Sequence, residues 1–141
     1  MNARQQLRIQ RDAIERSWAA FMSGEDIGPV RQEVLSSWQR TTHVVPPDAP
    51  SAPVCADDVD VAPLLASVHL LEREFTTTLL DSGVVVALAN PRGQIVWTTG
   101  EAALLRLAEQ ANFAPGALWD EASMGINAVS LALVSDGPST V

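Results

Sequence analysis

The sequence predicts an α+β fold in which an antiparallel sheet is flanked by helices and preceded by an N-terminal helical segment. Residues 84–89 are apolar and rich in valine, as in a central strand, and residues 94–99 alternate roughly between apolar and polar side chains. Asn90-Pro91-Arg92-Gly93 lies between them and has the composition of a turn. These observations predict an antiparallel β-hairpin.

Apolar residues at helical spacing predict four helices around this hairpin. The expected helices cover residues 3–22, 29–41, 61–82 and 101–110. Pro29 and Pro63 suit the first turn of a helix, where a missing N–H is harmless. In the last of the four helices, the residues expected to face inward are Ala103, Leu104, Leu107 and Ala108.

A further helix is predicted over residues 120–133, after a turn at Pro115-Gly116. This segment is apolar on nearly every side, which is typical of a buried helix. Its polar residues Ser123, Asn127 and Ser130 follow i, i+4, i+7 spacing and share one face. The sequence therefore predicts a core helix with one hydrogen-bonding stripe. Trp119, in the turn before it, is expected to pack against the hairpin.

The chain is expected to divide into three parts: a helical segment at residues 1–42, a linker at 43–58 and a further domain at 59–141. The linker holds four prolines among alanine, serine and aspartate, a composition that favours extended, poorly packed chain.

The formal net charge of −8 argues against a free-standing nucleic-acid binder, which normally carries a basic patch. Two helices joined by a short turn resemble a helix-turn-helix, so DNA binding through residues 1–41 is a weaker alternative. The joint at Gly24-Glu25-Asp26 is acidic, however, and the second helix offers only Arg31 and Arg40. We therefore expect no direct nucleic-acid binding by this segment.

The sequence carries no recognisable catalytic or metal-binding pattern. It contains no phosphate-binding glycine loop, and its two histidines and single Cys55 do not form a zinc motif. We expect neither enzymatic activity nor a cofactor or metal. No apolar run is long enough to cross a bilayer, and the lone cysteine fits a reducing compartment, so the expected location is the cytoplasm.

Two segments resemble motifs of a known family. Residues 30–40 read Val-Arg-Gln-Glu-Val-Leu-Ser-Ser-Trp-Gln-Arg, similar to the helix V-R-x-E-I-L-x-S-W-x-R of bacterial activators of acetoin and glycerol catabolism. Residues 116–128 resemble their segment G-x-x-W-x-E-x-x-x-G-T-N-A. The two motifs flank a hairpin, at residues 83–95, that is also similar to that of the family. Ile126 departs from the pattern, because it stands where the family usually has threonine.

The resemblance implies a GAF domain, an α+β sensory fold, at the N-terminus of a transcriptional regulator. Such a domain normally continues with further strands, so we expect the sheet to be incomplete in this chain. The implied function is to bind a small molecule or a partner protein and to signal to the transcription apparatus. A homodimerising interaction module without a ligand is the alternative.

The expected ligand cavity lies between the hairpin and the helix at residues 120–133. Its candidate contacts are Trp97, Trp119, Ser123, Asn127 and Ser130. Asn127 is the main polar candidate because an amide offers both donors and an acceptor. A role in bracing the local backbone is at least as well supported for this side chain.

The N-terminal helices at residues 3–22 and 29–41 are expected to mediate homodimerisation. The apolar stripe of the first helix consists of Leu7, Ile14, Trp18 and Phe21, spaced as in a helix–helix seam. The stripe is incomplete, since Gln10 or Arg11 occupies the position between Leu7 and Ile14. The alternative is that this helix folds back on residues 61–82.

Overall fold

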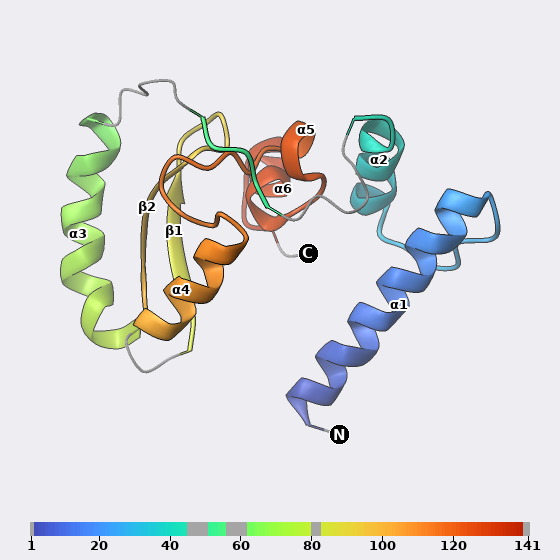
Figure 1. Ribbon diagram of the computed structural model, residues 1–141, viewed down its shortest axis with the longest axis horizontal. Coiled ribbons are helices and arrows are strands. Elements are labelled where there is room, and N and C mark those ends of the chain that lie inside the picture. The colour runs from blue at the N-terminus through green and yellow to red at the C-terminus, as the bar shows by residue number, and fades with distance from the viewer. Residues whose placement is uncertain (1, 45–50, 56–61, 80–82, 140–141) are drawn as a thin grey trace. The chain divides into compact units, whose positions relative to one another are not determined.

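The computed structural model describes residues 2–44, 51–55, 62–79 and 83–139 (Figure 1). The chain divides into two compact units, Met1–Ser36 and Ser37–Val141. The division falls within a helix.

The first unit consists mainly of helix α1, Ala3–Ser23, which confirms the helix predicted over residues 3–22. The Asn2 side chain accepts a hydrogen bond from the Gln5 N–H at 2.8 Å and caps the helix start. Gly24 ends the helix in the left-handed conformation. The rings of Trp18 and Phe21 stack with centroids 5.7 Å apart.

Helix α2, Gln32–Thr41, begins three residues later than predicted. The Asp26 carboxylate accepts a hydrogen bond from the Gly28 N–H at 3.1 Å, which holds a turn just before Pro29. The Leu35 N–H donates to the Arg31 carbonyl at 3.0 Å as the helix starts. Pro29 therefore belongs to the connection between α1 and α2 and not to a first helical turn.

The second unit contains the predicted hairpin, formed by β1, Val85–Ala89, and β2, Ile95–Gly100. The strands pair antiparallel, from Val85 opposite Gly100 to Ala89 opposite Ile95, with a bulge at the Ala89 end. The turn is closed by the Gly93 N–H, which donates to the Asn90 carbonyl at 2.9 Å. The fold class is therefore confirmed at the level of an α+β arrangement with a two-stranded antiparallel sheet.

Two helices flank this hairpin, α3, Ala62–Leu79, and α4, Ala102–Gln110. Both contact β2, and Figure 1 shows them on opposite sides of the hairpin. In α4, Leu104 and Ala108 are partly buried as expected. The expectation for Ala103 and Leu107 is wrong, because Ala103 is exposed and Leu107 is 60% exposed. Leu105 is partly buried instead, so the helix is turned relative to the prediction.

The loop after α4 pairs with the start of β2. The Ile95 N–H donates to the Ala117 carbonyl at 2.8 Å, and the Gly116 N–H donates to the Ile95 carbonyl at 2.8 Å. The Trp119 N–H donates to the Gly93 carbonyl at 2.8 Å. Ile95 and Ala117 are each only 1% exposed, so this junction is the centre of the unit.

Residues 51–55 pair with the other side of the same loop. The Leu118 N–H donates to the Pro53 carbonyl and the Cys55 N–H to the Gly116 carbonyl, both at 2.9 Å. Ala52 is buried. The expectation of poorly packed chain is therefore wrong for this part of the predicted linker. Proline lacks an N–H but keeps its carbonyl. Pro53 can therefore accept a hydrogen bond from the Leu118 N–H while its own nitrogen needs no partner, as for a proline in an edge strand.

The helix predicted over residues 120–133 is instead broken into α5, Glu121–Met124, and α6, Ala128–Ser135. Gly125 has φ 67° and ψ −160°, a conformation essentially restricted to glycine, and it interrupts the helix. The prediction of a buried helix is also wrong, because Ser130 is the buried residue of α6 and Val134 is 66% exposed.

We predict that Gly125→Ala lowers the free energy of unfolding by about 1–3 kcal/mol, because a side chain is strained at this backbone conformation. Gly137→Ala is the matched control, since Gly137 lacks a positive φ and a Cβ atom there would lie 3.9 Å from the Ser135 carbonyl oxygen. Urea denaturation measures both variants. Equal midpoints for the two would contradict the assignment of strain to Gly125.

Candidate functional site

Two side chains join the segments that resemble the family motifs. Arg40, in the last turn of α2, and Glu121, in the first turn of α5, form a bidentate salt bridge. The Arg40 Nη2 lies 2.7 Å from Glu121 Oε1, and the Arg40 Nε lies 3.0 Å from Oε2. The planar guanidinium matches the carboxylate with two parallel hydrogen bonds, which fixes their relative orientation.

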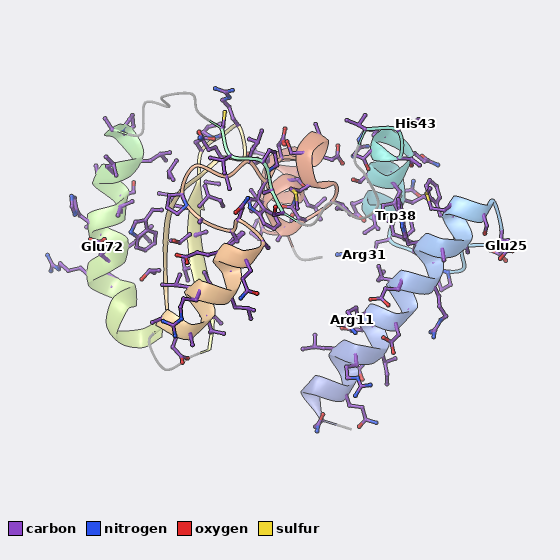
Figure 2. The ribbon with its side chains drawn as sticks, viewed as in Figure 1. Arg11, Glu25, Arg31, Trp38, His43 and Glu72 are labelled. Carbon is purple, nitrogen blue, oxygen red and sulfur yellow. The ribbon has the colours of Figure 1, made fainter. Side chains whose placement is uncertain are left out.

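The residues of α2 beside Arg40 are buried. Trp38, labelled in Figure 2, is 6% exposed, and Ser37 and Thr41 are also buried. The Thr41 hydroxyl donates to the Ser37 carbonyl at 2.8 Å, within the helix. The last turns of α2 are therefore anchored by packing as well as by the salt bridge.

The salt bridge shifts both pKa values. The hydrogen bond from Arg40 holds the pKa of Glu121 below its ordinary value, against a smaller opposing effect of burial. The nearby Ser37 hydroxyl also lowers this pKa, although its Oγ makes no hydrogen bond of normal geometry in the structure. The hydrogen bond to Glu121 raises the pKa of Arg40. The pair is therefore fully ionised at neutral pH.

The predicted ligand contacts Asn127 and Ser130 form a capping box at the start of α6. The Asn127 side chain accepts from the Ser130 N–H, and the Ser130 hydroxyl accepts from the Asn127 N–H, each at 3.0 Å. The Asn127 amide also donates to the Trp119 and Gly125 carbonyls at 3.1 and 3.0 Å. Both residues therefore brace the backbone, the alternative that the sequence left open for Asn127.

Ser123 belongs to a separate cap. Its backbone N–H donates to the Asp120 carboxylate at 3.1 Å, which caps α5. The three polar residues predicted to share one helical face therefore lie in two short helices, because Gly125 separates them.

The Trp119 side chain lies against the loop after α4. Its ring meets Phe113 edge-on with centroids 5.1 Å apart, and its indole N–H donates to the Asn112 carbonyl at 3.2 Å. The backbone of Trp119, bonded to Gly93, is the part that joins it to the hairpin turn. The structure thus brings Trp119, Asn127 and Ser130 together.

Trp97 is held by different elements. It lies in β2, and its indole N–H donates to the carboxylate of Glu72 on α3 at 3.2 Å. Glu72 is labelled in Figure 2. The side-chain hydrogen bonds of Trp119, Asn127 and Ser130 instead link residues 112–130.

The predicted dimerisation residues lie along α1. Leu7 and Ile14 are 65% and 46% exposed, and Trp18 and Phe21 are partly buried.

Among the described residues, no group of three or more histidine, cysteine or carboxylate side chains could hold a metal ion. No described helix has the length and apolar character needed to cross a membrane.

Sequence reasoning missed the pairing of Arg40 with Glu121. Both residues stand at fixed positions of the two motifs quoted above, and their opposite charges were the available signal. The two residues are 81 positions apart, and nothing in the sequence between them indicates that these two charges meet.

We predict that Glu121→Gln destabilises the protein at pH 7 and has little effect below the folded-state pKa of Glu121. Because folding lowers this pKa, the salt bridge stabilises the folded state above the unfolded-state pKa, and this contribution is lost as the pH falls through the folded value. Denaturant midpoints of both proteins, measured in a series from pH 7 downward, test this. Glu109→Gln, which neutralises an exposed carboxylate of α4, is the control. A pH-independent effect of Glu121→Gln would contradict the prediction.

We predict that Asn127→Ala lowers the free energy of unfolding by about 2 kcal/mol, because it removes a cap and two further backbone contacts. Asn127→Ser keeps an acceptor for the Ser130 N–H and should cost less. Chemical denaturation with both variants separates the cap from the bonds to Trp119 and Gly125. If both variants match the parent, Asn127 does not brace this segment.

No family model matches the chain, and no solved structure matches it. The chain is similar to an uncharacterized 47.3 kDa protein in the thcA 5′ region of Rhodococcus erythropolis, with 26% identity over 118 residues. The matched region covers 79% of this chain and 27% of that protein. The chain therefore spans about a quarter of the length of this relative.

Proposed function

We propose that this chain is a sensory region of the GAF type in a bacterial transcriptional regulator, similar to the activators of acetoin and glycerol catabolism. In this proposal residues 59–141 bind a small molecule or a partner protein, and the bound state is signalled to the transcription apparatus. The larger size of the Rhodococcus protein is compatible with a sensory region that forms part of a longer chain.

The bidentate contact between Arg40 and Glu121 is the observation that carries this proposal. Each residue belongs to one of the two segments that resemble the family, and the hairpin between those segments has the predicted turn and antiparallel pairing. A likeness in two distant segments gains weight when the segments are joined by a side-chain pair in which both members match the motifs.

The proposed ligand site lies beside Trp119, between the hairpin turn and the segment from Asp120 to Leu133. The aromatic pair of Trp119 and Phe113 supplies an apolar wall. Asn127 has its amide and its oxygen bonded to backbone groups, so in this proposal it fixes the wall. Ser130, whose hydroxyl also bonds to backbone groups, fixes the wall together with Asn127, and Ser123 and Trp97 are the further proposed contacts.

A thermal-shift screen of short-chain diols, ketones and organic acids tests the proposal. A ligand that binds the folded state raises the melting temperature in proportion to its occupancy. We predict that a hit loses its effect in Trp119→Leu, with Trp18→Leu as the matched control. Absence of any concentration-dependent shift across this set would contradict small-molecule sensing, and an equal shift in Trp119→Leu would move the site away from Trp119.

Self-association through α1 is a second proposed function, favoured by the exposure of Leu7 and Ile14 on one stripe. We predict that Ile14→Glu lowers the mass of the full chain measured by sedimentation at high concentration. Ile9→Glu is the matched control, because Ile9 is 48% exposed but lies on a different face of the helix. A monomeric parent chain would refute this function and leave ligand sensing untouched.

A further inference from the structure

We propose that α1 pairs with α1 of a second copy of this chain in the antiparallel orientation, and that Arg11 sets this orientation. The inference rests on the proposed self-association and adds the direction of the two helices.

The stripe of α1 that would contact the second copy includes an arginine. The residues of this stripe follow one another at steps of four, three, four and three residues, the spacing that places side chains on one face of a helix in a helix pair. They are Leu7, Arg11, Ile14, Trp18 and Phe21. Arg11 thus occupies the position at which the apolar stripe of α1 is incomplete.

Arg11 is exposed and already has a counterion in its own helix. Its Nε lies 3.3 Å from the Glu15 carboxylate, and the two side chains are 72% and 66% exposed. Figure 2 labels Arg11 on the middle of α1. The Arg11 side chain therefore lies on the exposed surface of α1, within reach of a second helix laid along this stripe.

A parallel pair in register would place each Arg11 opposite the Arg11 of the second copy. Two like charges would then meet at the seam and lose part of their hydration, which disfavours this orientation. Each Glu15 would neutralise its own arginine but would not remove the steric and solvation cost of packing two guanidinium groups in one layer.

An antiparallel pair removes this conflict. With Leu7 opposite Trp18 of the second copy, each Arg11 lies opposite Ile14 of the second copy, and Glu15 is the next residue along that helix. The aliphatic stem of Arg11 can cover Ile14 while its charged end reaches Glu15 of the second copy. The apolar residues Leu7 and Trp18 then form a layer at each end of the contact.

The other charges of the first unit agree with this direction. Arg8 lies in the first half of α1, and two acids, Glu25 and Asp26, follow the end of the helix. Antiparallel packing brings the basic beginning of one helix toward the acidic end of the other, whereas parallel packing gathers charges of the same sign.

Spin labels on the full chain test the orientation. A label at Ser23, introduced as Ser23→Cys in a Cys55→Ser background, lies near the end of α1. At about 1.5 Å per residue, the antiparallel alignment separates the two labels by roughly 30 Å along the helix axis. A parallel pair separates them by little more than the distance between helix axes, about 10 Å.

The expected result is one long distance in the parent chain by pulsed dipolar spectroscopy. Arg11→Leu should add a short-distance population, because it removes the like-charge conflict of the parallel pair. Arg16→Leu, on the face of α1 opposite the stripe, is the matched control and should leave the long distance unchanged. A short distance in the parent, or no response to Arg11→Leu, overturns this inference alone. A monomeric labelled chain overturns the self-association on which it rests.

Discussion

The second unit depends on the pairing of residues 116–119 with chain on both sides. This segment bonds to Gly93 and Ile95 of the hairpin on one side and to residues 53–55 on the other. A buried backbone must satisfy its donors and acceptors, so neither neighbour can be removed without leaving polar groups unpaired at the centre of the unit. The position of Trp119, and through it that of Asn127 and Arg40's partner Glu121, follows from this pairing.

Local patterns predicted most of the secondary structure. The turn composition at residues 90–93 and the change in apolar spacing around it identified the hairpin, and the stripe along α1 identified a helix whose ends agree with the structure within one residue. These features depend on residues that are close together in the sequence, so a single sequence is enough to predict them.

The wrong predictions concern segments whose structure is set by contacts between distant residues or by competing local hydrogen bonds. Periodicity extended one helix through residues 120–133, but Gly125 and the cap at Asn127 divide it, since a cap competes with continued helix. Proline content suggested a loose linker at residues 51–55, although carbonyl groups there pair with the loop after α4. The contact between Arg40 and Glu121 was not predicted, because it depends on tertiary packing that brings distant residues together.

The hairpin turn at Asn90–Gly93 also fixes an order of assembly. Its contacts join residues a few positions apart, so closing it costs little chain entropy, and it can form before the rest of the unit. Residues 116–119 acquire their partners, Gly93 and Ile95, only after the hairpin has formed. Residues 53–55 acquire theirs only after residues 116–119 are in place. We therefore expect this unit to fold outward from the hairpin, and we expect residues 53–55, which would dock last, to detach first when the structure opens locally.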